Sequence, residues 1–165
     1  MPVITLQTFI QAPVEVCFDL SRSIDLHLQS MQQHSEKAIA GVTSGLIGPG
    51  DTVTWKARHF GLPFTMTVQL TEMKYPVYFV DQMVKGPFKW FRHYHAFRAQ
   101  NNGTLMTDEF VFKSPLGWLG KITDKLVLHS YLQKMLQQRN DFIKRAAENS
   151  PVNLYHHELS TATTA

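Results

Sequence analysis

The sequence predicts an α+β fold in which a curved antiparallel sheet of about seven strands wraps around one long C-terminal helix. Apolar residues recur at helical spacing from Ser114 to Ala147. From residue 37 onward, the preceding region alternates apolar and polar side chains, which is the period of half-buried strands. Two short helical segments follow the first strand-like segment directly. Because a helix with so broad an apolar face must lie on an equally broad apolar surface, we expect it to cover the sheet and enclose a pocket.

The N-terminal third predicts one strand and two short helices. Residues 3–11 form the strand, and because neither of its faces is strongly polar, we expect it to be buried on both sides. Pro13 suits the start of the first helix, whose buried side we assign to Val16, Cys17 and Leu20. Ser23 is a suitable N-cap for the second helix.

Six further strands are predicted at residues 38–44, 51–59, 64–71, 77–84, 89–100 and 104–113. The last two form a hairpin, for which Asn102-Gly103 is a strong two-residue turn signal. This turn would place Phe97 opposite Asp108, His95 opposite Phe110 and His93 opposite Phe112. The apolar faces of the two strands then coincide, and Asp108 lies diagonally across from His95.

Length and composition favour one ordinary globular domain. The chain has 165 residues, of which 44% are hydrophobic and 18% charged. Its net charge of +3 is scattered, so nucleic acid is not an expected partner, and no apolar run approaches the roughly 20 residues of a membrane span. One cysteine and a start unlike a signal peptide predict a cytoplasmic protein. We expect the ligand-binding domain at 1–148 and a flexible polar tail at 149–165.

The inward-facing positions predict a pocket lined by aromatic residues and methionine, with a few polar groups, as is typical of sites for small apolar ligands. A filled core without space for a ligand is the alternative. The candidate ligand-binding residues are Trp55, His59, Phe64, Met66, Phe91, His93, His95, Asp108, Phe110, Tyr131 and Met135. Arg139 lies either at the surface or over the pocket, and Cys17 belongs to the core.

His93, His95 and Asp108 form the one cluster with potential chemistry. Buried imidazoles and a carboxylate must hydrogen-bond one another, so these residues form a structural cross-strand group, orient a ligand or act as acid and base. Together with His59 they also have the ligand types of a zinc site, although no thiolate supports this and we expect neither a metal nor another cofactor. No nucleophile elbow or phosphate-binding loop is present.

The order of elements resembles the START-like (SRPBCC, helix-grip) superfamily. The segments FDLSRSIDLHLQSM, AGVTSGLIGPGDTVTWKARHFG, VKGPFKWFRHYHAF and GTLMTDEFVFKSPLGWLG are similar to those of small bacterial proteins described as cyclase/dehydrase-like or cell division proteins. The resemblance covers about residues 3–147. It implies a hydrophobic cavity between the sheet and the long helix, for a lipid, isoprenoid or polyketide-like molecule.

Three functions remain open on this basis. The first is non-catalytic binding or carriage of such a hydrophobic or amphipathic molecule. The second is a cyclase/dehydrase-type enzyme that uses His93, His95 and Asp108. The third is an interaction module with a vestigial pocket and a protein partner. The sequence favours a binding protein over an enzyme and does not indicate the oligomeric state.

Overall fold

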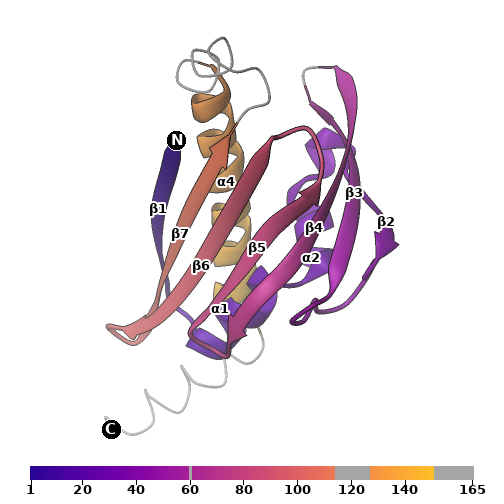
Figure 1. The fold of residues 1–165 in the computed structure, drawn as a ribbon. Coiled ribbons are helices and arrows are strands. Elements are labelled where there is room, and N and C mark those ends of the chain that lie inside the picture. The colour runs from indigo at the N-terminus through magenta and orange to yellow at the C-terminus, as the bar shows by residue number, and fades with distance from the viewer. Residues whose placement is uncertain (60, 114–126, 151–165) are drawn as a thin grey trace, which may run out of the picture.

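The structure is a computed structural model that describes residues 1–59, 61–113 and 127–150. Figure 1 shows its strands and helices. In chain order they are β1 (Val3–Ile10), α1 (Val14–Ser21), α2 (Ile24–Ser30), the 3₁₀ helix η1 (Gln32–His34), β2 (Lys37–Gly41), β3 (Thr52–His59), β4 (Leu62–Lys74), β5 (Tyr78–Lys85), β6 (Trp90–Gln100), β7 (Gly103–Lys113) and α4 (His129–Glu148).

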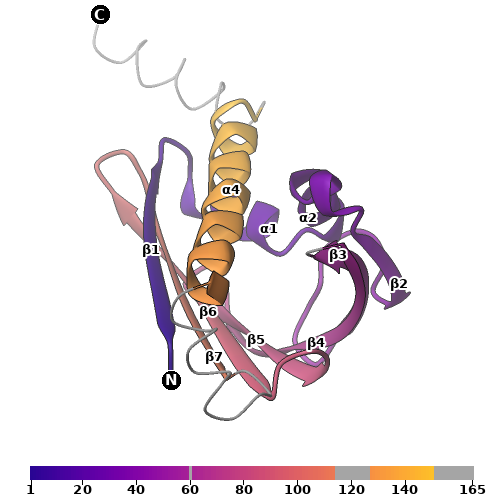
Figure 2. The same cartoon turned by 90° about the horizontal axis from the view of Figure 1, so that it is seen from above.

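The strands form one antiparallel sheet in the order β1-β7-β6-β5-β4-β3-β2. Figure 2 shows this sheet as an arc, with α4, α1 and α2 on its concave side. Helix α4 packs against β1, α1 and α2. The predicted helix-grip architecture, with a seven-stranded curved sheet and two short helices after the first strand, is therefore confirmed.

Strand β1 is buried on one face only. Its residues alternate strictly between exposed and buried, and Val3 and Phe9 are exposed. The expectation that both faces would be buried is wrong, because the described helices lie on the concave side of the sheet and leave the outer face of β1 exposed. Apolar residues on both faces were not sufficient evidence of double burial.

The pairing of β6 with β7 is shifted by two residues from the predicted register. Asn101 and Asn102 are the loop residues, both with positive φ (48° and 57°), and Gln100 pairs with Gly103. His95 therefore lies opposite Asp108, rather than opposite Phe110. Gly103 is therefore the first residue of β7 rather than a loop residue. This position requires glycine, because a Cβ there would lie 2.5 Å from the carbonyl oxygen of Ile10. Asparagine tolerates the left-handed conformation, so an Asn-Asn turn suffices.

The two short helices follow the prediction in position and differ in packing. The Ser23 hydroxyl accepts a hydrogen bond from the Leu26 amide (3.2 Å), as expected for the N-cap of α2. Helix α1 buries Cys17, Phe18 and Ser21, so its inner face is rotated relative to the predicted one. Phe18 rather than Leu20 points inward because it packs between the rings of Phe79 and Phe97.

Helix α4 buries a stripe at helical spacing that contains two polar residues. The buried residues are Leu132, Leu136, Arg139, Asn140, Ile143 and Ala147. Tyr131 and Met135, two of the candidate ligand-binding residues, lie at the half-buried border of this stripe. The predicted helix start at Ser114 falls outside the described residues, as does most of the predicted tail, residues 151–165. Among the described helices, none is both long and apolar enough to cross a membrane.

Candidate ligand-binding site

A cavity of about 160 Å³ lies among the inner faces of β3–β7 and helices α1, α2 and α4. Most of its walls are apolar, and the aromatic rings come chiefly from β3, β5, β6 and β7. The apolar side chains that line it are Ile24, Met31, Ile47, Val53, Trp55, Met66, Val68, Phe79, Phe88, Phe91, Phe110, Leu132, Met135 and Leu136.

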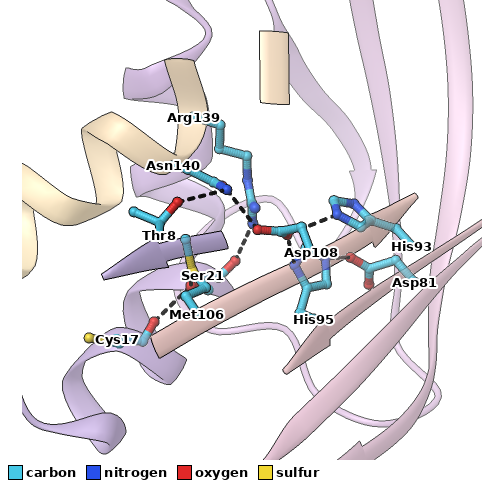
Figure 3. A network of polar contacts seen from close by, with 10 residues as sticks. All are labelled: Thr8, Cys17, Ser21, Asp81, His93, His95, Met106, Asp108, Arg139 and Asn140. Carbon is cyan, nitrogen blue, oxygen red and sulfur yellow. Dashed lines mark hydrogen bonds and ion pairs between the residues drawn. The ribbon is translucent and has the colours of Figure 1, made fainter. Parts of the chain in front are cut away.

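One wall carries a polar cluster around Asp108, which is 1% exposed. Its Oδ1 accepts a hydrogen bond from His93 Nε2 (2.9 Å), and its Oδ2 accepts one from Asn140 Nδ2 (2.7 Å). His95 Nδ1 forms an ion-pair contact with the same Oδ1 at 2.7 Å, at an angle unsuited to a hydrogen bond. Figure 3 shows these side chains converging on Asp108 from β6 and α4. The carboxylate thus joins the sheet to the long helix.

Asp81 holds His95 from the opposite side. His95 Nε2 donates a hydrogen bond to Asp81 Oδ2 (3.2 Å), so this imidazole lies between two carboxylates. Burial opposes a charge on His95, but the contacts with Asp108 and Asp81 outweigh it and raise the pKa of His95. Burial likewise disfavours the ionised form of Asp108. The hydrogen bond from His93 and the close contact with His95 prevail and hold the pKa of Asp108 well below its ordinary value.

His93 is the neutral member of the cluster. Burial, followed by the charge of His95, lowers the pKa of His93 to about 4. The two rings lie with centroids only 3.7 Å apart, so a second positive charge is strongly disfavoured. Since neutral His93 donates through Nε2, its Nδ1 is an acceptor. Nδ1 makes no hydrogen bond among the described residues, and His93 lines the cavity.

Arg139 reaches the same wall from α4. Its Nη2 donates a hydrogen bond to the carbonyl oxygen of Ser21, the last residue of α1, at 2.6 Å. Among the described residues, no carboxylate oxygen lies within 4.0 Å of the guanidinium, and the buried Nη1 makes no hydrogen bond. Arg139 therefore places a buried positive charge beside the cavity.

A second polar group lies near α2, η1 and β3. Glu36 Oε2 is 3.1 Å from His27 Nε2, and the His27 ring stacks on Trp55. Burial raises the pKa of Glu36, but the His27 contact outweighs it, so the pKa is lowered overall. His59 Nδ1 lies 2.7 Å from the hydroxyl of Tyr131, and burial with the nearby His34 lowers the pKa of His59. The cavity therefore has polar groups in two regions of its wall.

Solved structures resemble the chain over most of its length. TTHA0849 from Thermus thermophilus matches with a TM-score of 0.69 and 15% identity, covering 88% of this chain and 99% of that chain. The major latex-like protein 151 of Panax ginseng gives 0.66 and 16%, covering 88% and 97%. The di-domain ARO/CYC BexL of the BE-7585A biosynthetic pathway gives 0.70 and 16%, covering 91% and 51%.

The chain has the START-like helix-grip fold. At these identities the likeness establishes the fold alone. No family model matches the sequence, and no curated protein matches it.

Eight of the eleven predicted ligand-binding residues line the cavity, namely Trp55, His59, Met66, Phe91, His93, His95, Phe110 and Met135. Phe64, Asp108 and Tyr131 are not among its described lining residues. Asp108 lies behind the two imidazoles, because the corrected register places it directly opposite His95. Tyr131 contacts His59 instead of the cavity, and Phe64 also lies near the ring of His59.

Four residues of the site were not predicted, namely Asp81, Asn140, His27 and Glu36, and the position of Arg139 was left undecided. Three of these five residues have a signal in the sequence. Asp81 is the one carboxylate in the predicted strand 77–84, and Arg139-Asn140 interrupts the apolar stripe of the long helix. Burial of such groups requires partners, and therefore indicates a site.

Asp81, His93 and His95 also have the ligand types of a metal site, with ligand atoms within 4.8 Å of one another. This set differs from the one considered from sequence, because His59 interacts with Tyr131 and Asp108 lies behind the imidazoles. A ligating imidazole must be neutral. The raised pKa of His95 favours its proton instead, so a metal would have to displace that proton.

Proposed function

We propose that the protein binds and carries a hydrophobic or amphipathic small molecule in the cavity between the sheet and α4. The observation that carries the proposal is the apolar cavity of about 160 Å³ with buried polar groups confined to parts of its wall. A cavity of about 150 Å³ with apolar walls is sufficient for benzene. The eight predicted residues that line the cavity are the proposed ligand contacts, within a binding domain of residues 1–148. The single, buried Cys17 supports a cytoplasmic location.

The size of the cavity constrains the ligand. Sites for drug-sized molecules usually measure roughly 300–1,000 Å³. A cavity of about 160 Å³ suits one ring or a short aliphatic chain, and a larger lipid or polyketide would require the helices to move outward. We therefore propose a small apolar or amphipathic molecule as the preferred ligand.

An NMR titration with toluene tests this proposal. Val68 lines the cavity on β4, so a Val68→Phe variant fills it, whereas Val84→Phe adds the same ring at an exposed position on β5. We expect wild type and V84F to bind toluene and V68F to lose at least about tenfold in affinity. Circular dichroism checks that V68F is folded. Equal binding by folded V68F would contradict the proposed location, and no binding by wild type would contradict the proposed function.

Acid–base catalysis is a second candidate, supported by Nδ1 of His93, which makes no hydrogen bond with any residue that the structure describes. A neutral imidazole that donates Nε2–H to a carboxylate and faces a cavity with its other nitrogen has the geometry of a general base. However, the best general base has a pKa near the working pH, and the pKa of His93 is about 4. The weak basicity of His93 therefore ranks catalysis below binding.

Deuterium exchange tests this candidate. A small ketone such as phenylacetone, incubated in D₂O with the protein, would exchange its α-hydrogens faster than in buffer if His93 acts as the base. The His93→Gln variant should abolish this acceleration and still bind toluene. Exchange at the buffer rate in wild type, or equal acceleration in H93Q, would contradict catalysis by His93.

A further inference from the structure

Arg139 combines burial, positive charge and an unused donor. It is 7% exposed, it lines the cavity, and its Nη1 makes no hydrogen bond with the described residues. A guanidinium keeps its charge at any ordinary pH and has five N–H donors. The contact of Nη2 with Ser21 at the end of α1 accounts for a structural role. It leaves both hydrogens of Nη1 without an acceptor among the described residues.

The nearby carboxylates are committed elsewhere. Asp108 Oδ1 accepts a hydrogen bond from His93 and forms an ion-pair contact with His95, and Asp108 Oδ2 accepts a hydrogen bond from Asn140. Asp81 Oδ2 forms an ion pair with the other side of His95. The contacts with Asp81 and Asp108 favour the protonated form of His95, and a protonated His95 together with Arg139 would balance the two carboxylates. Neutrality lowers the overall energy of the cluster. It does not provide Nη1 with a hydrogen-bond acceptor.

Burial of such a donor is unfavourable unless something accepts its hydrogen bonds. The C-terminal carbonyls of α1 carry only a partial negative charge, and one of them is already used by Nη2. A carboxylate matches a guanidinium in charge and in its two-pronged geometry. An acid that enters the cavity would therefore supply what the described residues do not.

We propose that the ligand is a small apolar carboxylic acid whose carboxylate accepts hydrogen bonds from Arg139 Nη1. Its apolar part, one ring or a short chain, lies against the aromatic wall formed by Phe79, Phe91 and Phe110. This inference rests on the proposed binding function and specifies the ligand class. Figure 3 shows Arg139 extending from α4 toward Ser21 and Asp108.

Two probes of equal shape, 3-phenylpropionate and 3-phenylpropanamide, separate charge from shape. Calorimetric titration should show that wild type binds the acid about 10- to 100-fold more tightly than the amide, which is the usual effect of a charge-assisted hydrogen bond. Arg139→Met should remove this preference. Arg145→Met should keep it, because Arg145 lies on the same helix, is exposed and is not among the residues that line the cavity.

A second variant and a direct readout protect the test against misfolding. Arg139→Gln is neutral and keeps a polar amide on a shorter side chain, so it should lack the preference for the acid, and circular dichroism checks that it is folded. In wild type, the NMR signals of the Arg139 guanidinium should shift with the acid and much less with the amide. Equal affinity for acid and amide in wild type, or a preference that survives in R139M or R139Q, would overturn the inference.

The toluene titration separates the two proposals. If toluene binds while acid and amide bind equally, the cavity functions as a binding site and the assignment of an acid is wrong. If neither toluene nor the acid binds, both proposals fail.

Discussion

Replacing Asp108 with asparagine removes the carboxylate that joins β6, β7 and α4. Asp108 is 1% exposed and contacts His93, His95 and Asn140 within 2.9 Å. Asparagine has nearly the same shape, but its amide hydrogens would face either the two imidazoles or Asn140, and a donor would then meet a donor. His95 would also keep a positive charge with only Asp81 to balance it.

The expected loss of stability follows from these contacts. Removing one partner of a buried ion pair typically costs about 3–5 kcal/mol, because the other charge remains buried. For a chain of this size, such a loss corresponds to a decrease in Tm of roughly 6–20 °C. The three contacts are not summed, since neighbouring interactions are not additive.

Denaturant unfolding of D108N, His95→Gln and the double variant measures the effect and its origin. Glu109→Gln, an exposed neighbour on β7, is the control and should change stability by less than about 0.5 kcal/mol. Because Asp108 and His95 interact, the double variant should lose less than the sum of the two single losses. A loss below about 1 kcal/mol in D108N, or additive losses, would refute the ion-pair argument.

Three further predictions concern pH, backbone packing and thiol reactivity. The pKa of His93 is about 4 in the folded protein and ordinarily 6.5. As the pH decreases, His93 therefore takes up a proton in the unfolded chain first, and the free energy of unfolding should fall between about pH 6.5 and pH 4. In urea titrations at several pH values, H93Q should show a weaker dependence of stability on pH. Gly103→Ala should destabilise the fold by about 1–3 kcal/mol, because the added Cβ would clash with the Ile10 carbonyl oxygen. Gly48→Ala, whose Cβ would make only an ordinary contact, should be nearly neutral in the same urea titration. Equal losses of stability in the two variants would contradict the steric argument. Buried Cys17, whose pKa burial raises to about 11, should resist a thiol reagent in native protein and react after unfolding, and fast native reaction would show that α1 opens readily.

The fold could be predicted because its signals are local. Alternation with a period of two is visible along each strand, and the helical stripe is visible along α4. Trp55 and Phe91, for example, line the cavity, and the alternation along their strands was sufficient to predict their inward orientation. These patterns do not require knowledge of which strand pairs with which.

The register and much of the polar site could not be predicted because they depend on tertiary contacts. Asn102-Gly103 is the stronger turn signal in isolation, but the Ile10 carbonyl on β1 leaves space only for glycine at the start of β7. A shift of two residues keeps each side chain on its face and changes its partner, so the apolar faces alone could not reveal the error. Arg139 is buried in contact with the last residue of α1, and the spacing along α4 does not show that contact.

The hydrogen bonds of α4 also determine when the site can form. Arg139 contacts Ser21 across 118 positions of the chain, and Asn140 contacts Thr8 across 132. During synthesis from the N-terminus, the end of α1 and the carboxylate of Asp108 exist well before the helix that completes them. A nascent chain that ends before residue 139 would contain every strand of the described sheet and still lack the arginine that we propose selects the ligand. Ligand binding would thus begin only when α4 has docked, so that a bound acid would stabilise chains that include α4 and not those that end before Arg139.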